Sequence, residues 1–196
     1  MRVGVLALQG DFREHVMLLD AMEVETVEVR VPEDLAGLDA VVIPGGESTT
    51  IGRLARSYGL LDPLRDAIRD GMPALGTCAG MIFLAAATTG PAQPQLGVLD
   101  VIVERNAFGR QVDSFEADLP IAGEDEPVHA VFIRAPWIEK LGTEVEVLTS
   151  VEDPESGEVR PVFVRQGRIL ATAFHPELTG ETRIHRMLLD LARKER

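Results

Sequence analysis

A short stretch in the middle of the chain, Gly76-Thr77-Cys78-Ala79-Gly80, constrains the fold more than any other. It follows a brief apolar run and leads into residues 81–87, which are good helix formers. This order predicts a strand, a tight turn and a helix, with a cysteine at the corner. Small residues on both sides of Cys78 let strand and helix pack closely while the central side chain projects from the turn.

Cys78 is the only cysteine in the sequence, so the chain has no internal disulfide. A lone cysteine can simply be a small buried hydrophobic residue. The pattern Gly-x-Cys-x-Gly, however, is the thiol form of the nucleophile elbow, and the positive end of a helix dipole favours the thiolate. The flanking glycines and the strand-to-helix context therefore favour a nucleophile.

Apolar and helical segments alternate through the first half of the chain. We expect strands at residues 3–8, 26–31 and 40–43, and helices at 12–22 and 51–58. Such alternation predicts an α/β fold, a three-layer, flavodoxin-like arrangement in which helices flank a mostly parallel sheet. Ligands of these folds bind beyond the carboxyl ends of the strands. Three unusual loops fall there: Gln9-Gly10, Gly45 to Ser48, and the Cys78 elbow.

The second half reads mainly as strands and ends in a helix. We expect strands at residues 96–104, 115–119, 128–134 and 169–174, a hairpin formed by 144–151 and 161–165 around a polar turn at 153–157, and a closing amphipathic helix at 182–193. The strands at 115–119 and 128–134 are expected to be antiparallel and to lie at one edge of the sheet.

The composition is that of an ordinary globular protein. Its 196 residues suit a single domain spanning residues 1–196, and the formal net charge of −13 argues against a partner that is nucleic acid or an anionic membrane. No signal or membrane segment is visible. A single thiol without such a segment indicates the reducing cytoplasm.

The glycine loop, Pro44 to Thr50, joins an expected strand to an expected helix. Ser48 or Thr49 could cap that helix. An ordinary turn is one interpretation, and a phosphate loop is another, although the Walker lysine and spacing are missing. Beside a nucleophile elbow, the loop becomes a candidate oxyanion hole, with one amide from Gly46 and the other from Ala79.

The segment His175-Pro176-Glu177 is the second chemical centre. Side chains two residues apart on an extended segment point to the same side, so Glu177 can bind one ring nitrogen of His175 and leave the other free as a base. We expect Pro176 to keep the segment out of a helix. A strand end that happens to carry a histidine and a glutamate is the alternative. The remaining histidines, His15, His129 and His185, are interpreted as ordinary structural or surface residues, and no Cys/His cluster has metal-site spacing, so no metal or cofactor is expected.

These features together resemble the class I, triad-type glutamine amidotransferases, and most closely the family of glutaminase subunits of pyridoxal 5′-phosphate synthase. The motifs that carry the resemblance are Leu8-Gln9-Gly10, Arg13-Glu14-His15, Pro44 to Thr50, Gly76 to Gly80, Val103-Glu104-Arg105-Asn106, Phe108 to Phe115, Phe132-Ile133-Arg134-Ala135-Pro136 and Phe174 to Thr179. They run in order from residue 8 to 179 and cover nearly the whole chain.

The resemblance implies hydrolysis of L-glutamine to L-glutamate and ammonia, with the ammonia passed to a separate synthase subunit. It implies that Cys78 is the nucleophile of a triad with His175 and Glu177. It also implies a set of residues that contact glutamine: Gly46, Glu47, Ser48, Arg105, Ile133 and Arg134. An arginine suits the α-carboxylate because its fork binds bidentately.

Two features depart from the family pattern. Asp11-Phe12 stands where small apolar residues are common, near the expected site and partner contact. The acidic segment 152–161 is long and is expected only to lengthen a hairpin.

Three other functions remain open from the residues. A triad glutaminase of a nucleotide or histidine pathway would share the Cys78 chemistry and differ in its acceptor. A cysteine hydrolase acting on peptides or γ-glutamyl conjugates would need a wide cleft around Cys78. A regulatory subunit that only binds glutamine would not need the intact set of cysteine, histidine and glutamate.

Overall fold

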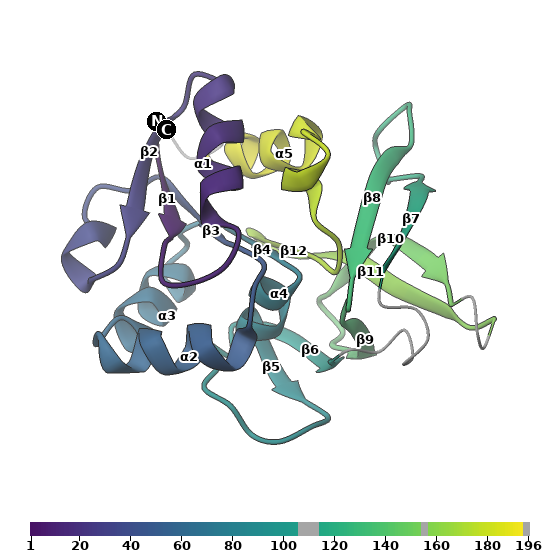
Figure 1. Ribbon diagram of the computed structural model, residues 1–196, viewed down its shortest axis with the longest axis horizontal. Coiled ribbons are helices and arrows are strands. Elements are labelled where there is room, and N and C mark those ends of the chain that lie inside the picture. Colours follow the sequence, from purple (N-terminus) through teal and green to yellow (C-terminus); the bar gives the residue numbers. More distant parts are fainter. Residues whose placement is uncertain (106–113, 154–156, 194–196) are drawn as a thin grey trace.

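A seven-stranded sheet forms the centre of the computed structural model, which describes residues 1–105, 114–153 and 157–193 (Figure 1). Its strand order is β10-β11-β12-β4-β3-β1-β2. The five strands from β12 to β2 are parallel, whereas β10 and β11 pair antiparallel at one edge. The strands are β1 (Arg2–Leu6), β2 (Glu25–Val29), β3 (Ala40–Ile43), β4 (Ala74–Thr77), β10 (Glu146–Glu152), β11 (Val159–Gln166) and β12 (Ile169–Thr172).

Helices cover both faces of this sheet. The helices α1 (Phe12–Ala21) and α5 (Thr182–Arg193) lie on one face, and α2 (Ser48–Ser57) and α3 (Leu61–Arg69) lie on the other (Figure 1). The short helix α4 (Ala79–Leu84) packs against β4 and contacts α2. Two short 3-10 helices, η1 (Pro32–Leu35) and η2 (Pro176–Leu178), also occur in the described part of the chain. The order β2-β1-β3-β4-β12 is the flavodoxin-like order, so the predicted fold class is confirmed.

The buried strands explain why the sheet forms. Every residue of β3 and β4 is buried, as expected for central strands covered by helices on both faces. The closing helix α5 buries Ile184, Leu188 and Leu189 along one stripe. These side chains belong to one hydrophobic cluster. The position of the functional loops is therefore set by a rigid core.

One predicted helix is too long. Residues 81–87 were expected to be helical, but α4 ends at Leu84 and residues Ala85–Thr88 form the strand β5. Alanine favours helices, yet β5 pairs in parallel with β6 (Leu99–Glu104), beginning with Ala85 opposite Leu99. This tertiary pairing overrides the local propensity.

The start of α2 also differs from the prediction. The helix begins at Ser48 rather than near Ile51, and its N-cap is Glu47, not Ser48 or Thr49. The Glu47 carboxylate accepts hydrogen bonds from the backbone N–H groups of Thr49 and Thr50. A carboxylate at this position also interacts favourably with the helix dipole.

The remaining β structure is partly as expected. The strands β7 (Ser114–Leu119) and β8 (Val128–Ile133) are antiparallel, but they form a separate two-stranded sheet and not an edge of the main sheet. The predicted hairpin is confirmed as β10 and β11, with residues 154–156 of its turn outside the described part. The strand β9 (Trp137–Leu141), which pairs with β6, and the helix α3 were not predicted. Residues 106–113 of the resemblance motifs also lie outside the described residues.

The close approach of α4 to the sheet depends on Gly80. A Cβ atom at this position would lie 2.1 Å from the backbone oxygen of Ile43 in β3. Because backbone is rigid, the helix would have to move away from the strand to accept any side chain.

The substitution Gly80→Ala should therefore lower the free energy of unfolding by about 1–3 kcal/mol, the usual cost of overpacking a tight core. Gly90→Ala is the matched control, because a Cβ there meets nothing within 4 Å; we expect it to change stability by less than about 0.5 kcal/mol. Urea unfolding of both variants measures the difference, and equal midpoints would show that α4 does not need this close contact.

Candidate functional site

Cys78 occupies the corner between β4 and α4. Its φ of +49° is unusual for a residue with a side chain, and such strained backbone is typical of a nucleophile elbow. The Cys78 N–H donates to the Thr172 carbonyl at 2.8 Å, which fixes the corner beside the end of β12. The side chain keeps 7% of its surface exposed, at the wall of a cavity.

His175 and Glu177 follow the end of β12 directly. His175 Nδ1 lies 2.7 Å from Glu177 Oε1, and both residues are buried. The prediction that Pro176 keeps this segment out of a helix was wrong. Pro176 is the first residue of the 3-10 helix η2. Proline is favourable at the first helical position because its missing N–H needs no partner there. The predicted pairing of imidazole and carboxylate is nevertheless present in the structure.

The electrostatics of this pair favour a charged imidazole next to the cysteine. Burial of the His175 ring opposes its protonation, but hydrogen bonds and charge from Cys78 and Glu177 outweigh burial and raise the pKa of His175 to about 10. Burial raises the pKa of Glu177, and the bond from His175 opposes that change. The arrangement can therefore stabilise a thiolate–imidazolium pair.

The glycine loop packs directly against the histidine and against the loop after β1. A Cβ at Gly45 would lie 2.4 Å from His175 Cε1, so only glycine allows this contact. The Gly45 carbonyl accepts a hydrogen bond from the Asp11 N–H at 3.1 Å, and the Glu47 N–H donates to Gln9 Oε1 at 2.7 Å. Gly46, between them, has a φ of +146°. The Gly45–Gly46 peptide is thus tied on both sides to the loop between β1 and α1.

One cavity brings the predicted site residues together. It is lined by Gly46, Glu47, Ser48, Cys78, Ala79, Ile82, Arg105, Ile133 and Arg134. An adjoining hollow shares part of this lining and adds His175 together with Gln9 and Asp11. Only Ile82 in the first cavity was not among the expected site residues.

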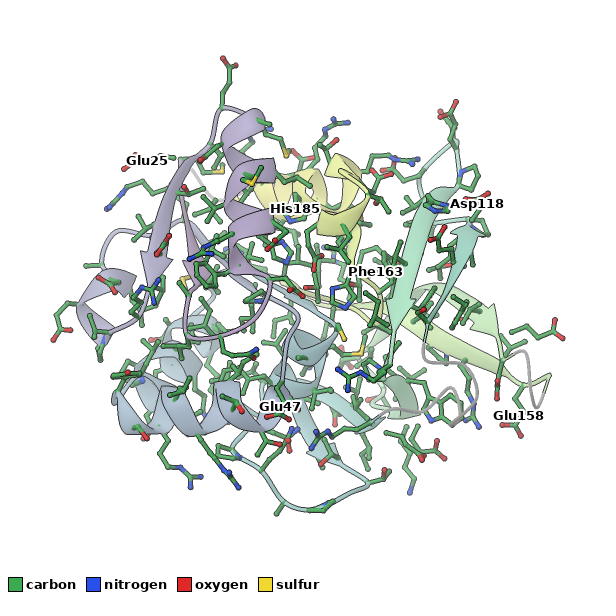
Figure 2. The ribbon with its side chains drawn as sticks, in the orientation of Figure 1. Glu25, Glu47, Asp118, Glu158, Phe163 and His185 are labelled. Atoms are coloured by element: carbon green, nitrogen blue, oxygen red, sulfur yellow. The ribbon has the colours of Figure 1, made fainter. Side chains whose placement is uncertain are left out.

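Arg105 and Glu47 form a charged pair at the wall of this cavity. Arg105 Nη2 lies 3.1 Å from Glu47 Oε1, and Arg105 Nη1 lies 3.1 Å from Gln93 Oε1. Burial raises the pKa of Glu47, but the hydrogen bonds from Thr50 and Thr49 outweigh it and lower that pKa overall. Glu47 is therefore an anion whose orientation is fixed; Figure 2 shows it at the start of α2. Gln93 was not among the predicted site residues; it comes from an irregular loop, where no local pattern marks it.

Arg134 lines the same cavity, but its guanidinium is not paired like that of Arg105. It follows β8 with a φ of +43°, a strained conformation for a residue with a side chain, and its side chain is exposed. The same segment is anchored to the triad, because the His175 N–H donates to the Val131 carbonyl at 2.9 Å. In the described part of the chain, no hydrogen bond or ion pair of the Arg134 guanidinium is present.

Two of the histidines interpreted as ordinary lie directly behind Glu177. His15 on α1 and His185 on α5 are completely buried, with 2.8 Å between His15 Nδ1 and His185 Nε2. His15 Nε2 is 3.5 Å from Glu177 Oε2. Figure 2 labels His185 in the interior beside α1. Helical spacing places His15 on the same face as Leu18 and Leu19, a signal that it is buried. His129, by contrast, is exposed.

Asp11, His175 and Glu177 are the described residues that could hold a metal ion. One potential ligand atom of each lies within 4.8 Å of the others. The distance from His175 Nδ1 to Asp11 Oδ2 is 3.7 Å, but the same nitrogen already bonds Glu177 at 2.7 Å. A cation here would compete with the contact that orients the imidazole.

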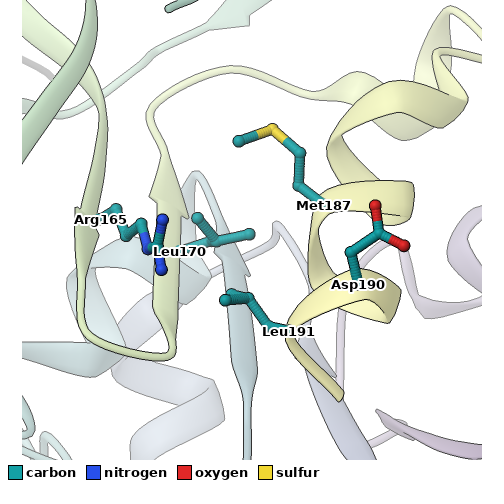
Figure 3. A pocket seen from close by; sticks show the side chains of 5 residues that line it. All are labelled: Arg165, Leu170, Met187, Asp190 and Leu191. Atoms are coloured by element: carbon teal, nitrogen blue, oxygen red, sulfur yellow. The ribbon is translucent and has the colours of Figure 1, made fainter. Parts of the chain in front are cut away.

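A further hollow lies between α5 and the hairpin of β11 and β12 (Figure 3). Its lining residues are Arg165, Leu170, Met187, Asp190 and Leu191. Leu170 is near the amino end of a parallel strand, whereas ligands of these folds bind beyond the carboxyl ends. This hollow is therefore separate from the candidate site.

The fold and the site together define an α/β protein with a cysteine on an elbow and a histidine–glutamate pair at the same sheet edge. The model of the SNO glutamine amidotransferase family matches residues 5–193. The chain belongs to this family, which confirms the resemblance found in the sequence.

Individual relatives and a solved structure agree. A protein of Parafrankia sp. (strain EAN1pec) named pyridoxal 5′-phosphate synthase subunit PdxT is 58% identical over 99% of this chain and 94% of its own. A protein of the same name from Acidothermus cellulolyticus is 59% identical over 94% and 90%, respectively. A structure described as a crystal structure of glutamine amidotransferase is 55% identical, with a TM-score of 0.90 over 97% of this chain and 98% of that one.

Proposed function

We propose that this chain is a single glutaminase domain that hydrolyses L-glutamine to L-glutamate and ammonia, and that it delivers the ammonia to a pyridoxal 5′-phosphate synthase subunit. The observation that carries the chemistry is the contact of His175 with Glu177 beside Cys78, at the wall of a cavity lined by an anion and two arginines. The names of the relatives support the choice of pathway over other triad glutaminases.

The first half of the reaction forms a thioester. The Cys78 thiolate attacks the side-chain amide carbon of glutamine, and the carbonyl oxygen becomes an oxyanion. The N–H groups of Gly46 and Ala79 stabilise this charge. His175 gives its proton to the amide nitrogen, the C–N bond breaks, and ammonia leaves.

The second half releases glutamate. Neutral His175 removes a proton from water, and the resulting hydroxide attacks the γ-glutamyl thioester. The carbon–sulfur bond breaks and returns the thiolate beside the imidazolium. Glu177 holds the imidazole in one tautomer through both halves, because its Oε1 binds Nδ1.

Substrate recognition uses opposite charges on the cavity wall. The Arg134 guanidinium, which has no partner among the described residues, binds the α-carboxylate, and Arg105 lines the same cavity with its guanidinium on Glu47. The Glu47 carboxylate suits the α-ammonium group. Ser48, Ile133 and the backbone at Gly46 complete the lining.

The Cys78→Ser variant tests the nucleophile. We expect an intact fold with hydrolysis almost abolished, because a serine hydroxyl is far less ionised than a thiol. Glutamate release, measured in the presence of the synthase subunit, gives the rate, and glutamine binding is followed by calorimetry. Substantial turnover by this variant would contradict the proposed mechanism. Glutamine binding without turnover by the unmodified chain would instead indicate a regulatory subunit.

The Arg134→Ala variant tests recognition. A charge-assisted contact is worth roughly 1.5–3 kcal/mol, so the KM for glutamine should rise about 10- to 100-fold while kcat changes little. Arg53→Ala, on the exposed face of α2, is the matched control and should leave both constants unchanged. A KM equal to that of the control would remove Arg134 from the substrate site.

Association with the synthase subunit is proposed to activate the site. The Gly45–Gly46 peptide is tied to the loop between β1 and α1, which lines the outer hollow through Gln9 and Asp11. A partner that contacts this loop can therefore turn the Gly46 amide toward or away from the oxyanion. Because the thiol must stay reduced, we also place this assembly in the cytoplasm.

The isolated chain should consequently hydrolyse glutamine about 100- to 1,000-fold more slowly than the complex, the usual effect of one missing oxyanion donor. The measurement is glutamate release from the purified chain, followed by titration with the synthase subunit. Equal turnover with and without the partner would refute activation and leave the triad chemistry standing.

A further inference from the structure

A second layer of polar side chains lies beside the Glu177 oxygen that does not bind His175. It consists of Thr77 at the end of β4, His15 on α1 and His185 on α5, all with no exposed surface. His15 Nε2 is 3.2 Å from Thr77 Oγ1 and 3.5 Å from Glu177 Oε2. The reaction as derived above uses none of these three side chains.

Glu177 needs a hydrogen-bond donor on this side. Its Oε1 is bound by His175, whereas its Oε2 is buried and makes no hydrogen bond of ordinary length within the described residues. A buried carboxylate oxygen without a donor is costly. The only ring nitrogen that faces it in the described part is His15 Nε2.

The contact between the two histidines limits their tautomers. Burial, followed by the charges of His185 and His175, lowers the pKa of His15, and burial lowers the pKa of His185 to about 4 despite an opposing backbone contact at Glu181. Both rings are therefore neutral near pH 7, and each carries one N–H. His185 Nδ1 is buried and makes no hydrogen bond within the described residues, so the proton of His185 belongs on Nε2, where it donates to His15 Nδ1. His15 then carries its own proton on Nε2. The reverse assignment would turn a lone pair of His15 toward the Glu177 carboxylate.

We propose that His15 is a positioning residue of the triad, whose Nε2–H holds the second carboxylate oxygen of Glu177, and that His185 fixes the tautomer that makes this possible. The inference rests on the proposed function, because its purpose is to keep Glu177 Oε1 on His175. Other charged and titratable groups lie around Glu177 and the two histidines. They are Cys78 and Asp11 on the substrate side, Glu14 along α1, and Glu181 beside His185.

The test compares two substitutions of His15 with one control. His15→Leu removes the donor, whereas His15→Gln keeps an amide N–H near the position of Nε2. His129→Leu is the matched control, because His129 is exposed on β8 and contacts Glu116 and Asp118 instead. We expect His15→Leu to lower kcat of the complex about 10- to 100-fold, as the loss of an orienting partner does elsewhere, with KM unchanged. His15→Gln should recover most of this rate.

A second readout separates positioning from a merely structural role. Cys78 is the only cysteine, so the rate of its alkylation by iodoacetamide against pH reports the thiolate–imidazolium pair alone. In His15→Leu the acidic limb of this profile should move to higher pH, and in His15→Gln and His129→Leu it should stay in place. The measurement needs no glutamine turnover, so it judges the inference even if Cys78→Ser overturns the proposed function.

Three results would overturn the inference. They are an unchanged profile and kcat in a folded His15→Leu variant, a His15→Gln variant as impaired as His15→Leu, or equal losses in the His129→Leu control. Thermal unfolding establishes which variants are folded. If His15→Leu does not fold, the same comparison is made at the neighbouring ring with His185→Leu and His185→Gln. Equal pH profiles of Cys78 alkylation for those two variants would contradict the proposal.

Discussion

The parallel pairing of β4 with β12 is the constraint on which the rest of the site depends. Thr77 stands opposite Thr172 in this pair, so the chain leaves both strands at the same edge of the sheet. Cys78 follows one strand immediately and His175 follows the other within three residues. A shift of one residue in the register would reverse every side chain of β12 and separate the thiol from the imidazole. The apolar faces of both strands hold that register, because helices cover them on both sides.

The buried histidines near this edge of the sheet differ in the direction in which their pKa values are shifted. His175, next to the thiol, has a raised pKa and favours the cation, whereas His15 and His185, farther into the core, have lowered pKa values and stay neutral. Burial disfavours charge at all three rings, and only at His175 do the contacts with Cys78 and Glu177 outweigh burial. Glu177 stands between the two environments and contacts both. A second cation behind Glu177 would compete with His175 for its charge, so neutral rings are the arrangement compatible with the triad.

The fold class and the contact of His175 with Glu177 could be predicted from the sequence because both depend on local patterns. The elbow at Cys78 and the segment from His175 to Glu177 are short, and glycine or proline marks each of them. The contact of His15 with His185 could not be found in this way, because the two residues are 170 positions apart and local patterns do not report contacts between distant helices. Residues 85–87 were wrongly predicted as helix for the same reason, since the pairing with β6 is not local. The capping role of Glu47 was assigned to Ser48 or Thr49, whose residue types are the commoner caps.

The glycine loop combines a rigid half with an adjustable half, and this division follows from its hydrogen bonds. Glu47 caps α2 and binds Arg105 with the same carboxylate, so any rotation of this side chain would break the cap as well as the ion pair. The Glu47 carboxylate is therefore held in place before any ligand binds, which lowers the entropy lost on binding. Gly46, one residue earlier, has no side chain to hold it, and its peptide is restrained through the Gly45 carbonyl and the Asp11 N–H, which a moving loop can release. The fixed carboxylate and the adjustable amide belong to adjacent residues, so the Gly46 peptide can turn while Glu47 keeps its contacts with α2 and Arg105.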